Sequence, residues 1–162
     1  MASAARPLLQ LTHDPLRVVS SSQEARYAGH SEARALQFAM LPESDEPDPP
    51  SLHKAIMPRP AGYLWTLTNP AGLTIALRAR DFPFGKYARR DARGLARRAR
   101  ELVVTHVSDG QLKHRGWWLS LDGQVVLLSA RIRPIGQRPE AERDVRAAFR
   151  LLLELQDSLV MS

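Results

Sequence analysis

The sequence has no cysteine, which excludes disulfide bonds, a thiolate nucleophile and cysteine-ligated zinc or iron–sulfur centres. No apolar run reaches the roughly 20 residues that a membrane-spanning helix needs, and no apolar block of signal-peptide length follows Arg6. The 162 residues are 44% apolar and 25% charged, a composition that suits a globular domain with a core. We therefore expect a single domain over residues 1–162, located in the cytoplasm.

The sequence also lacks a recognisable catalytic or metal-binding motif. His106, Asp109 and His114 form a histidine–carboxylate group within a short window. Their spacing matches no metal-ligand pattern, and turn-rich segments contain such residues routinely. We therefore expect neither catalysis nor a cofactor or bound metal.

Positive charge is concentrated in one part of the chain. The net charge is +6 overall, whereas the window 78–100 alone carries +7, so all other residues together sum to −1. Against Asp81 and Asp91, the window holds nine cations: Arg78, Arg80, Lys86, Arg89, Arg90, Arg93, Arg97, Arg98 and Arg100. Arginine outnumbers lysine 20 to 3 throughout, a bias that genome composition can produce, so the clustering is the informative feature.

The first 60 residues divide into two segments. Residues 1–41 are expected to form strands, at 16–20 and, from its alternation of apolar residues, at 34–41; a helix capped by Ser22 is the alternative. Residues 42–60 contain six prolines and four acids, which predicts an acidic, proline-rich linker or solvated surface loop. A second interpretation is that the acids at 43–48 fold back over the basic patch and mimic a polyanion.

The rest of the chain has clear periodicity. Residues 63–68 and 73–78 alternate around an Asn-Pro-Ala-Gly turn, which predicts a hairpin. Residues 117–121 and 124–132 flank an Asp-Gly turn, a strong hairpin signal, and the second strand is apolar on both faces, as a central strand is.

Two helices are predicted by apolar residues at helical spacing. The first begins near Tyr87, with alanines and leucines on one face and arginines on another. The second begins at Pro139 and Glu140. Its buried stripe is expected to be Val145, Ala148, Phe149, Leu152, Leu155 and Leu159.

The two halves of the chain resemble each other. GYLWTL from Gly62 matches GWWLSL from Gly116. Ala79-Arg80 and Pro83–Gly85 match Ala130-Arg131 and Pro134–Gly136, and Arg90–Arg93 matches Arg143–Arg146. The offset stays between 51 and 54 residues in all these matches. Each half reads strand, strand, helix, over 62–107 and 116–160. The expected fold class is α+β: a duplicated ββα unit forming one antiparallel sheet with two helices packed on one face, plus N-terminal strands.

The duplication distinguishes residues that recur in both halves from the additional cations of the first half. Because the Arg-Asp-x-Arg motif recurs, its first role is structural, and Asp91 and Asp144 are expected to interact with the positive ends of the helix dipoles. The cations of the first helix exceed those of the second, so any special function is expected to depend on them.

The additional cations of the first helix favour non-specific binding of DNA or RNA through the phosphate backbone. Arginines spaced at i, i+4 and i+7 on a helix can each reach a phosphate. Neighbouring Trp117 and Trp118 face opposite sides of a strand, so one of them lies outside the face that buries the other and could stack on bases. The candidate nucleic-acid-binding residues are Arg78, Lys86, Arg89, Arg93, Arg97, Arg98, Arg100 and Trp118.

The alternative is a homodimeric protein-interaction or chaperone-like adaptor module without catalytic activity, whose arginines contact an acidic protein partner. Leu151, Leu152, Leu153 and Leu155 make the last helix apolar beyond one stripe, which a monomer would have to hide. The helix-free face of the sheet would be covered by residues 1–41, by a second copy or by a client protein. A helix buried on two sides within one chain would also explain these leucines.

Overall fold

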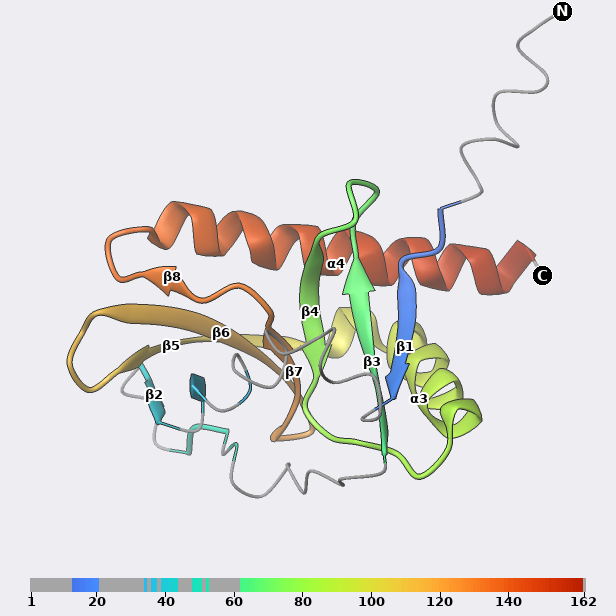
Figure 1. Cartoon of the computed structure of the whole chain (residues 1–162), viewed down its shortest axis with the longest axis horizontal. Helices are drawn as coiled ribbons and strands as arrows, with labels where there is room; N and C mark the ends of the chain where they lie inside the picture. The colour runs from blue at the N-terminus through green and yellow to red at the C-terminus, as the bar shows by residue number, and fades with distance from the viewer. Residues whose placement is uncertain are drawn as a thin grey trace, which may run out of the picture.

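The computed structural model describes residues 13–20, 34, 36–37, 39–43, 48–50, 52 and 62–161. Within these residues eight strands form one antiparallel sheet in the order β1-β3-β4-β7-β6-β5-β2, with β8 paired to β6 (Figure 1). The strands are β1 (Leu16–Ser20), β2 (Met40–Pro42), β3 (Tyr63–Thr68), β4 (Thr74–Arg78), β5 (Val103–Asp109), β6 (His114–Leu121), β7 (Gln124–Ser129) and β8 (Arg133–Pro134). With helices α3 (Gly85–Arg97) and α4 (Arg138–Met161), the α+β class with an antiparallel sheet is confirmed.

Both predicted hairpins are present and adjoin each other at the centre of the sheet. β3 pairs with β4, β6 pairs with β7, and β4 pairs with β7. At the β6–β7 turn both Asp122 (φ 53°) and Gly123 (φ 81°) have positive φ, as a two-residue hairpin turn of the primed type requires. The prediction that the apolar strand after this turn is central is confirmed for β7.

The boundary between the halves differs from the expected one. β5 pairs with β6 and β2, and not with the β3–β4 hairpin that precedes it in the chain. Three strands therefore lie on each side of the β4–β7 junction, β1-β3-β4 on one side and β7-β6-β5 on the other, with β2 added beyond β5. Each set of three is followed in the chain by one helix, α3 or α4.

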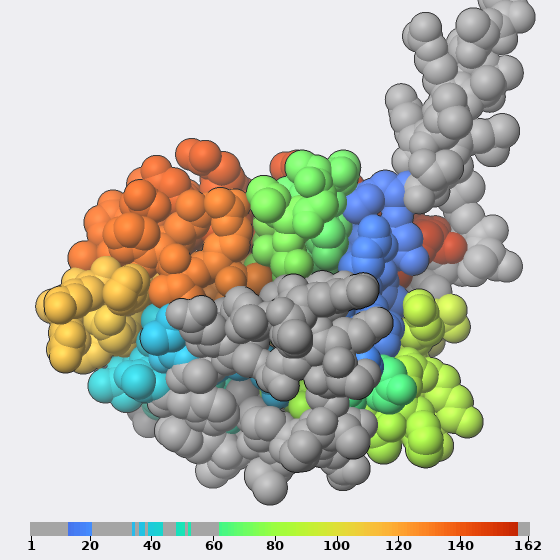
Figure 2. Space-filling view, in the orientation of Figure 1, coloured from blue at the N-terminus to red at the C-terminus, as the bar shows by residue number. Residues whose placement is uncertain are grey.

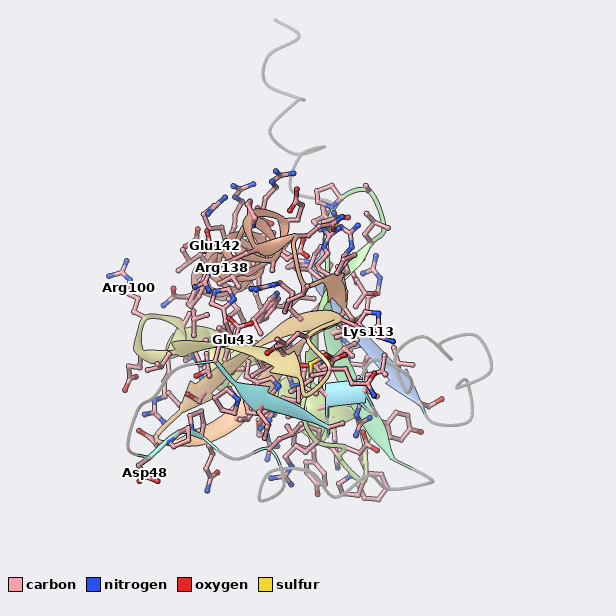
Figure 3. All side chains as sticks on the ribbon, turned by 90° about the vertical axis from the view of Figure 1, so that its left-hand side faces the viewer. Glu43, Asp48, Arg100, Lys113, Arg138 and Glu142 are labelled. Carbon is pink, nitrogen blue, oxygen red and sulfur yellow. The ribbon has the colours of Figure 1, made fainter. Side chains whose placement is uncertain are left out.

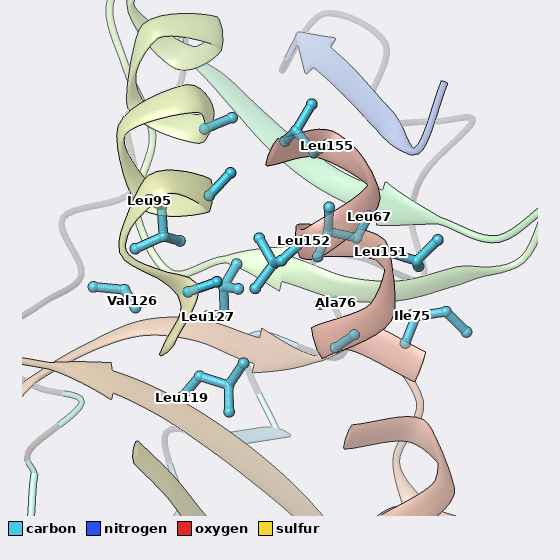
Figure 4. Packing of buried hydrophobic residues seen from close by; sticks show 14 of the residues in the cluster. Leu67, Ile75, Ala76, Leu95, Leu119, Val126, Leu127, Leu151, Leu152 and Leu155 are labelled. Carbon is cyan, nitrogen blue, oxygen red and sulfur yellow. The ribbon is translucent and has the colours of Figure 1, made fainter. Parts of the chain in front are cut away.

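The main core lies between the sheet and the two helices. Ala88, Ala92 and Ala96 of α3 are fully buried, and their small side chains let the helix approach the strands closely. Figure 4 shows the leucines of α4 projecting toward α3 and toward the strands. Trp65 and Trp117 are fully buried in this same cluster.

A smaller cluster covers the helix-free face of the sheet. It contains Trp118, Val125 and Leu128 from the strands, together with Met40 and Leu52 from the N-terminal part of the chain. Coverage by the chain's own N-terminal residues is thus present on this face.

The prediction of a strand over residues 34–41 is wrong for its first part. Arg34, Leu36 and Gln37 are helical, and the strand begins at Met40. Arg34 and Gln37 are both buried: Arg34 pairs with Asp81, in the connection after β4, at 2.9 Å, and Gln37 donates to the Ser129 carbonyl of β7 at 2.7 Å. Residues three apart share a helix face, whereas in a strand they would point to opposite sides.

Candidate nucleic-acid interface

Helix α3 divides into a buried face and a cationic face. Ala88, Ala92, Leu95 and Ala96 are buried. The exposed face carries five cations at spacings of three or four residues, which places them on one side of the helix. We call this set the cationic stripe: Lys86, Arg89, Arg90, Arg93 and Arg97. At about 1.5 Å of rise per residue, the stripe is about 16 Å long.

No ion pair links the stripe to any acid in the part of the chain that the structure describes. Like charges at i, i+4, such as Arg89, Arg93 and Arg97, each cost an isolated helix about 0.2–0.5 kcal/mol. α3 also has no acid in its first turn, where Lys86 opposes the helix dipole. Helix stability therefore does not account for the stripe.

Two of the remaining candidates lie just beyond α3 in different electrostatic states. Arg98 donates to Glu101 at 2.9 and 3.0 Å and to Asp122 at 3.0 Å. The hydrogen bonds that Arg98 donates to Glu101 and Asp122 raise the pKa of Arg98, and the bonds to Glu101 lower the pKa of Glu101. Arg100 is exposed and points away from the body of the molecule (Figure 3). Arg98 is thus neutralised, and Arg100 is available to an anion.

The assignment of Arg78 to the binding surface is wrong, because this residue is only 7% exposed. Its Nε lies 2.7 Å from the Asp91 Oδ2 atom, and its Nη1 donates to the Val126 carbonyl at 2.9 Å. Trp65 donates to the same Asp91 carboxylate at 2.7 Å. Arg78 therefore joins the central strands to α3 and cannot reach a phosphate.

The assignment of Trp118 is also wrong. Trp117 and Trp118 do face opposite sides of β6, as predicted, but both sides are covered. Trp117 lies beneath the helices, and Trp118, 3% exposed, packs in the cluster that contains Met40 and Leu52. The three tryptophans thus offer no stacking surface.

Two exposed aromatic residues were missed by the sequence reasoning. Phe84 is 57% exposed and Tyr87 is 38% exposed at the start of α3. They lie in the DFPFGKY segment of the basic window. Their position before the buried alanine stripe, outside any alternating strand pattern, is the signal that could have identified them.

The repeated aspartates do not act on the helix dipoles as expected. Asp91 is the seventh residue of α3, and Asp144 is the seventh residue of α4, beyond the first turn where the dipole acts. Each instead accepts an arginine from the sheet side: Asp91 from Arg78, and Asp144 from Arg133 at 2.9 Å. The structural role expected for the motif is present in this other form.

The acidic segment makes its described contacts far from the stripe. Glu43 lies 3.4 Å from an Arg115 nitrogen and 3.3 Å from an Arg138 nitrogen, and Figure 3 shows Glu43 close to Arg138 and Glu142. Asp48 is exposed, and residues 44–47 lie outside the described residues. For Glu43, the interpretation as a cover for the basic patch is wrong.

The histidine–carboxylate group does not converge into a site. Asp109 and His114 lie 3.3 Å apart, whereas His106 is half-buried beside other groups; burial, followed by the nearby Arg138 charge, lowers its pKa. Among the described residues, no three histidine, aspartate or glutamate side chains gather as metal ligands would. No described helix is both long and apolar enough to traverse a bilayer.

The leucines of α4 are accounted for within one chain. Leu151, Leu152 and Leu155 are buried between α3 and the sheet, and Leu153 alone of the four leucines at 151–155 is substantially exposed, at 38%. The apolar excess that suggested a dimer is therefore covered largely by the chain's own core.

Comparisons with known proteins add no further constraint. No protein-family model matches the chain, and neither the curated proteins nor the solved structures contain a match to it.

Proposed function

We propose that the protein binds nucleic acid non-specifically, through phosphate contacts made by the cationic stripe and Arg100. The observation that carries this proposal is the stripe itself: five exposed cations on one helix face, with no acid paired to them among the described residues. Each phosphate that is neutralised releases condensed counterions, which is the main source of non-specific affinity.

The shape of the surface supports the proposal. A stripe of about 16 Å can reach several successive phosphates, since a DNA strand carries about one phosphate per 3.4 Å of duplex axis. In the space-filling view the residues at the start of α3 project at a corner of the molecule beside β1 (Figure 2). A projecting convex helix can approach a polyanion without rearrangement of the sheet.

Matched variants of the two helices test this proposal. Arg90, Arg93 and Arg97 are the sixth, ninth and thirteenth residues of α3, and Arg143, Arg146 and Arg150 occupy the same positions in α4. Fluorescence anisotropy with duplex oligonucleotides across a salt series should show at least a tenfold loss of affinity when the α3 set is replaced by glutamine. The slope of log K against log salt should become shallower by about 3, because each duplex phosphate contact contributes about 0.9.

The α4 glutamine set removes the same charge from the same helix positions and should change affinity less than threefold. Equal losses from both sets would leave only an effect of net charge and would contradict a binding stripe. No binding at low salt, combined with capture of an acidic protein that the α3 set abolishes, would favour the adaptor function.

We infer that the two halves are copies of one unit, and that the unit is strand-strand-strand-helix rather than ββα. Three register pairs join the halves: Ala76–Ser129, Leu77–Leu128 and Arg78–Leu127. Leu77 and Leu128 differ by 51 positions. The same offset relates Ala76 to Leu127 and Arg78 to Ser129, so it converts each of the other two pairs into the other. A twofold axis between the two leucines requires this relation. The matching helix positions of Asp91 and Asp144 support this interpretation.

A further inference from the structure

The exposed aromatic pair lies at the edge of the cationic stripe. The Phe84 and Tyr87 rings are 5.6 Å apart between centroids and meet edge to face. Lys86 Nζ lies 5.4 Å from the Tyr87 ring centroid, and the Arg90 guanidinium carbon lies 5.7 Å from it. Two members of the stripe therefore lie over the Tyr87 ring as cation–π partners, at the edge of the exposed aromatic surface.

The pair is not required by the fold. The second half places Gln137 before α4 and Glu140 at its third position, where the first half has Phe84 and Tyr87. α4 nevertheless packs on the same sheet with a buried stripe of its own. Exposed phenylalanine and tyrosine side chains thus occur only on the half that also has the all-cationic face.

The surface combines two features that single-strand binding uses. Aromatic rings stack on base faces with little dependence on sequence, and neighbouring cations track the backbone. In a duplex the base faces are already stacked on one another, so Phe84 and Tyr87 would find only backbone and groove edges. The combination therefore discriminates between single strands and duplexes, which the stripe alone does not.

We propose that the start of α3 binds single-stranded nucleic acid, with bases stacking on Phe84 and Tyr87 while Lys86, Arg90 and the rest of the stripe hold the phosphates. This proposal rests on the proposed function, because it names the form of nucleic acid that the same surface prefers. Its distinctive claim is that the aromatic rings contribute to single-strand affinity independently of the phosphate contacts.

The test replaces both rings by leucine, which keeps apolar bulk and removes the stacking face, and by tryptophan, which retains it. Affinity for a homothymidine strand should fall about tenfold in Phe84→Leu/Tyr87→Leu and stay within about twofold in Phe84→Trp/Tyr87→Trp. Duplex affinity should be unchanged in both variants. An abasic strand of equal length should bind the wild type about as weakly as the leucine variant binds homothymidine, and the leucine change should have no effect on its binding.

Leu73→Ala removes another exposed apolar side chain, 48% exposed, and serves as the control; it should leave single-strand affinity unchanged. The proposal is overturned if the leucine variant binds homothymidine as the wild type does, or if it loses duplex affinity equally. It is also overturned if vesicles containing anionic phospholipid, and not homothymidine, lose binding in the leucine variant. If the α3 glutamine set abolishes binding while the leucine variant has no effect, phosphate binding stands and stacking alone fails.

Discussion

The exposed faces of α3 and α4 carry arginines at the same three helix positions, but the face of α3 is cationic whereas that of α4 is nearly balanced. On α4, Arg143, Arg146 and Arg150 share their face with Glu142, Glu154 and Asp157, so three cations meet three anions. On α3 the corresponding arginines, Arg90, Arg93 and Arg97, are joined by Lys86 and Arg89, with no anion on that face.

The charge difference between the two helices comes from a few positions of α3. Its arginines at three helix positions also occur in the second half, whereas Lys86 and Arg89 replace Pro139 and Glu142, and Tyr87 replaces Glu140. In the second half Glu142 pairs with Arg138 at 3.1 Å. The all-cationic face of α3 therefore depends on residues in its first two turns that differ from those at the same positions of α4.

The largest expected effect, on the free energy of unfolding, concerns the arginine–aspartate pair that each half contains, Arg78–Asp91 or Arg133–Asp144. Asp91→Ala and Asp144→Ala each leave a largely buried arginine without its carboxylate, a change that costs about 3–5 kcal/mol in fully buried pairs. Because the Asp91 side chain is 26% exposed and the Arg133 side chain 19% exposed, we expect losses of about 2–3 kcal/mol in the free energy of unfolding, measured by urea denaturation.

The matched control for this pair is Asp157→Ala, which removes an exposed carboxylate of α4 and should change stability by less than about 0.5 kcal/mol. A loss confined to only one of the two aspartate variants would break the correspondence between the helices.

A smaller effect concerns the pH dependence of the free energy of unfolding, to which a histidine of the second half contributes. His106 lies opposite Trp117, where Val18 lies opposite Trp65 in the first half. Burial is the main cause that lowers the pKa of His106, followed by Arg138, with Arg115 adding to it and Glu43 and Glu142 opposing it. Because the unfolded chain then binds the proton more tightly, this contribution to stability is present above pH of about 6.5 and is lost as pH falls through the folded pKa.

We therefore expect the free energy of unfolding to decrease below pH of about 6.5 by no more than about 1.4 kcal/mol per pH unit from this group. Urea denaturation at a series of pH values should show a shallower dependence in His106→Gln than in the wild type. Identical slopes for His106→Gln and the wild type would remove this difference between the halves.

The smallest effect distinguishes two adjacent arginines. Arg97 belongs to the stripe, whereas Arg98 is held by Glu101 and Asp122. In anisotropy titrations at low salt, Arg97→Gln should weaken nucleic-acid binding severalfold, as expected for one lost phosphate contact, and Arg98→Gln should change it less than twofold. If both substitutions weaken binding equally, total charge rather than the placement of free cations determines affinity.

The sequence predicted the elements whose signals are local. The Asp122-Gly123 turn, the alternation of β3 and the alanine spacing of α3 each depend on neighbours within a few positions. β3 has its expected bounds, and α3 begins two residues before its expected start. Lys86, Arg89, Arg93 and Arg97 of the stripe were among the candidates for the same reason, because helical spacing fixes which residues share a face. Arg90 was not among them.

The errors arise where partners are distant in the chain. The burial of Arg78 depends on Asp91 in the next element and on a β7 carbonyl. The burial of Trp118 depends on Met40 and Leu52, more than 60 residues earlier. The start of the 34–41 segment was misassigned because Arg34 and Gln37 are polar residues that are buried through bonds to Asp81 and to the Ser129 carbonyl. A hydrophobic pattern contains none of this information.

The segment that covers the helix-free face also imposes an order on assembly. Gln37 bonds to Ser129 across 92 positions and Glu43 to Arg138 across 95, so these contacts cannot form until most of the chain has left the ribosome. Contacts of such long sequence separation carry a high loop-closure cost and slow folding. We expect this face to close last, after both hairpins and both helices have assembled.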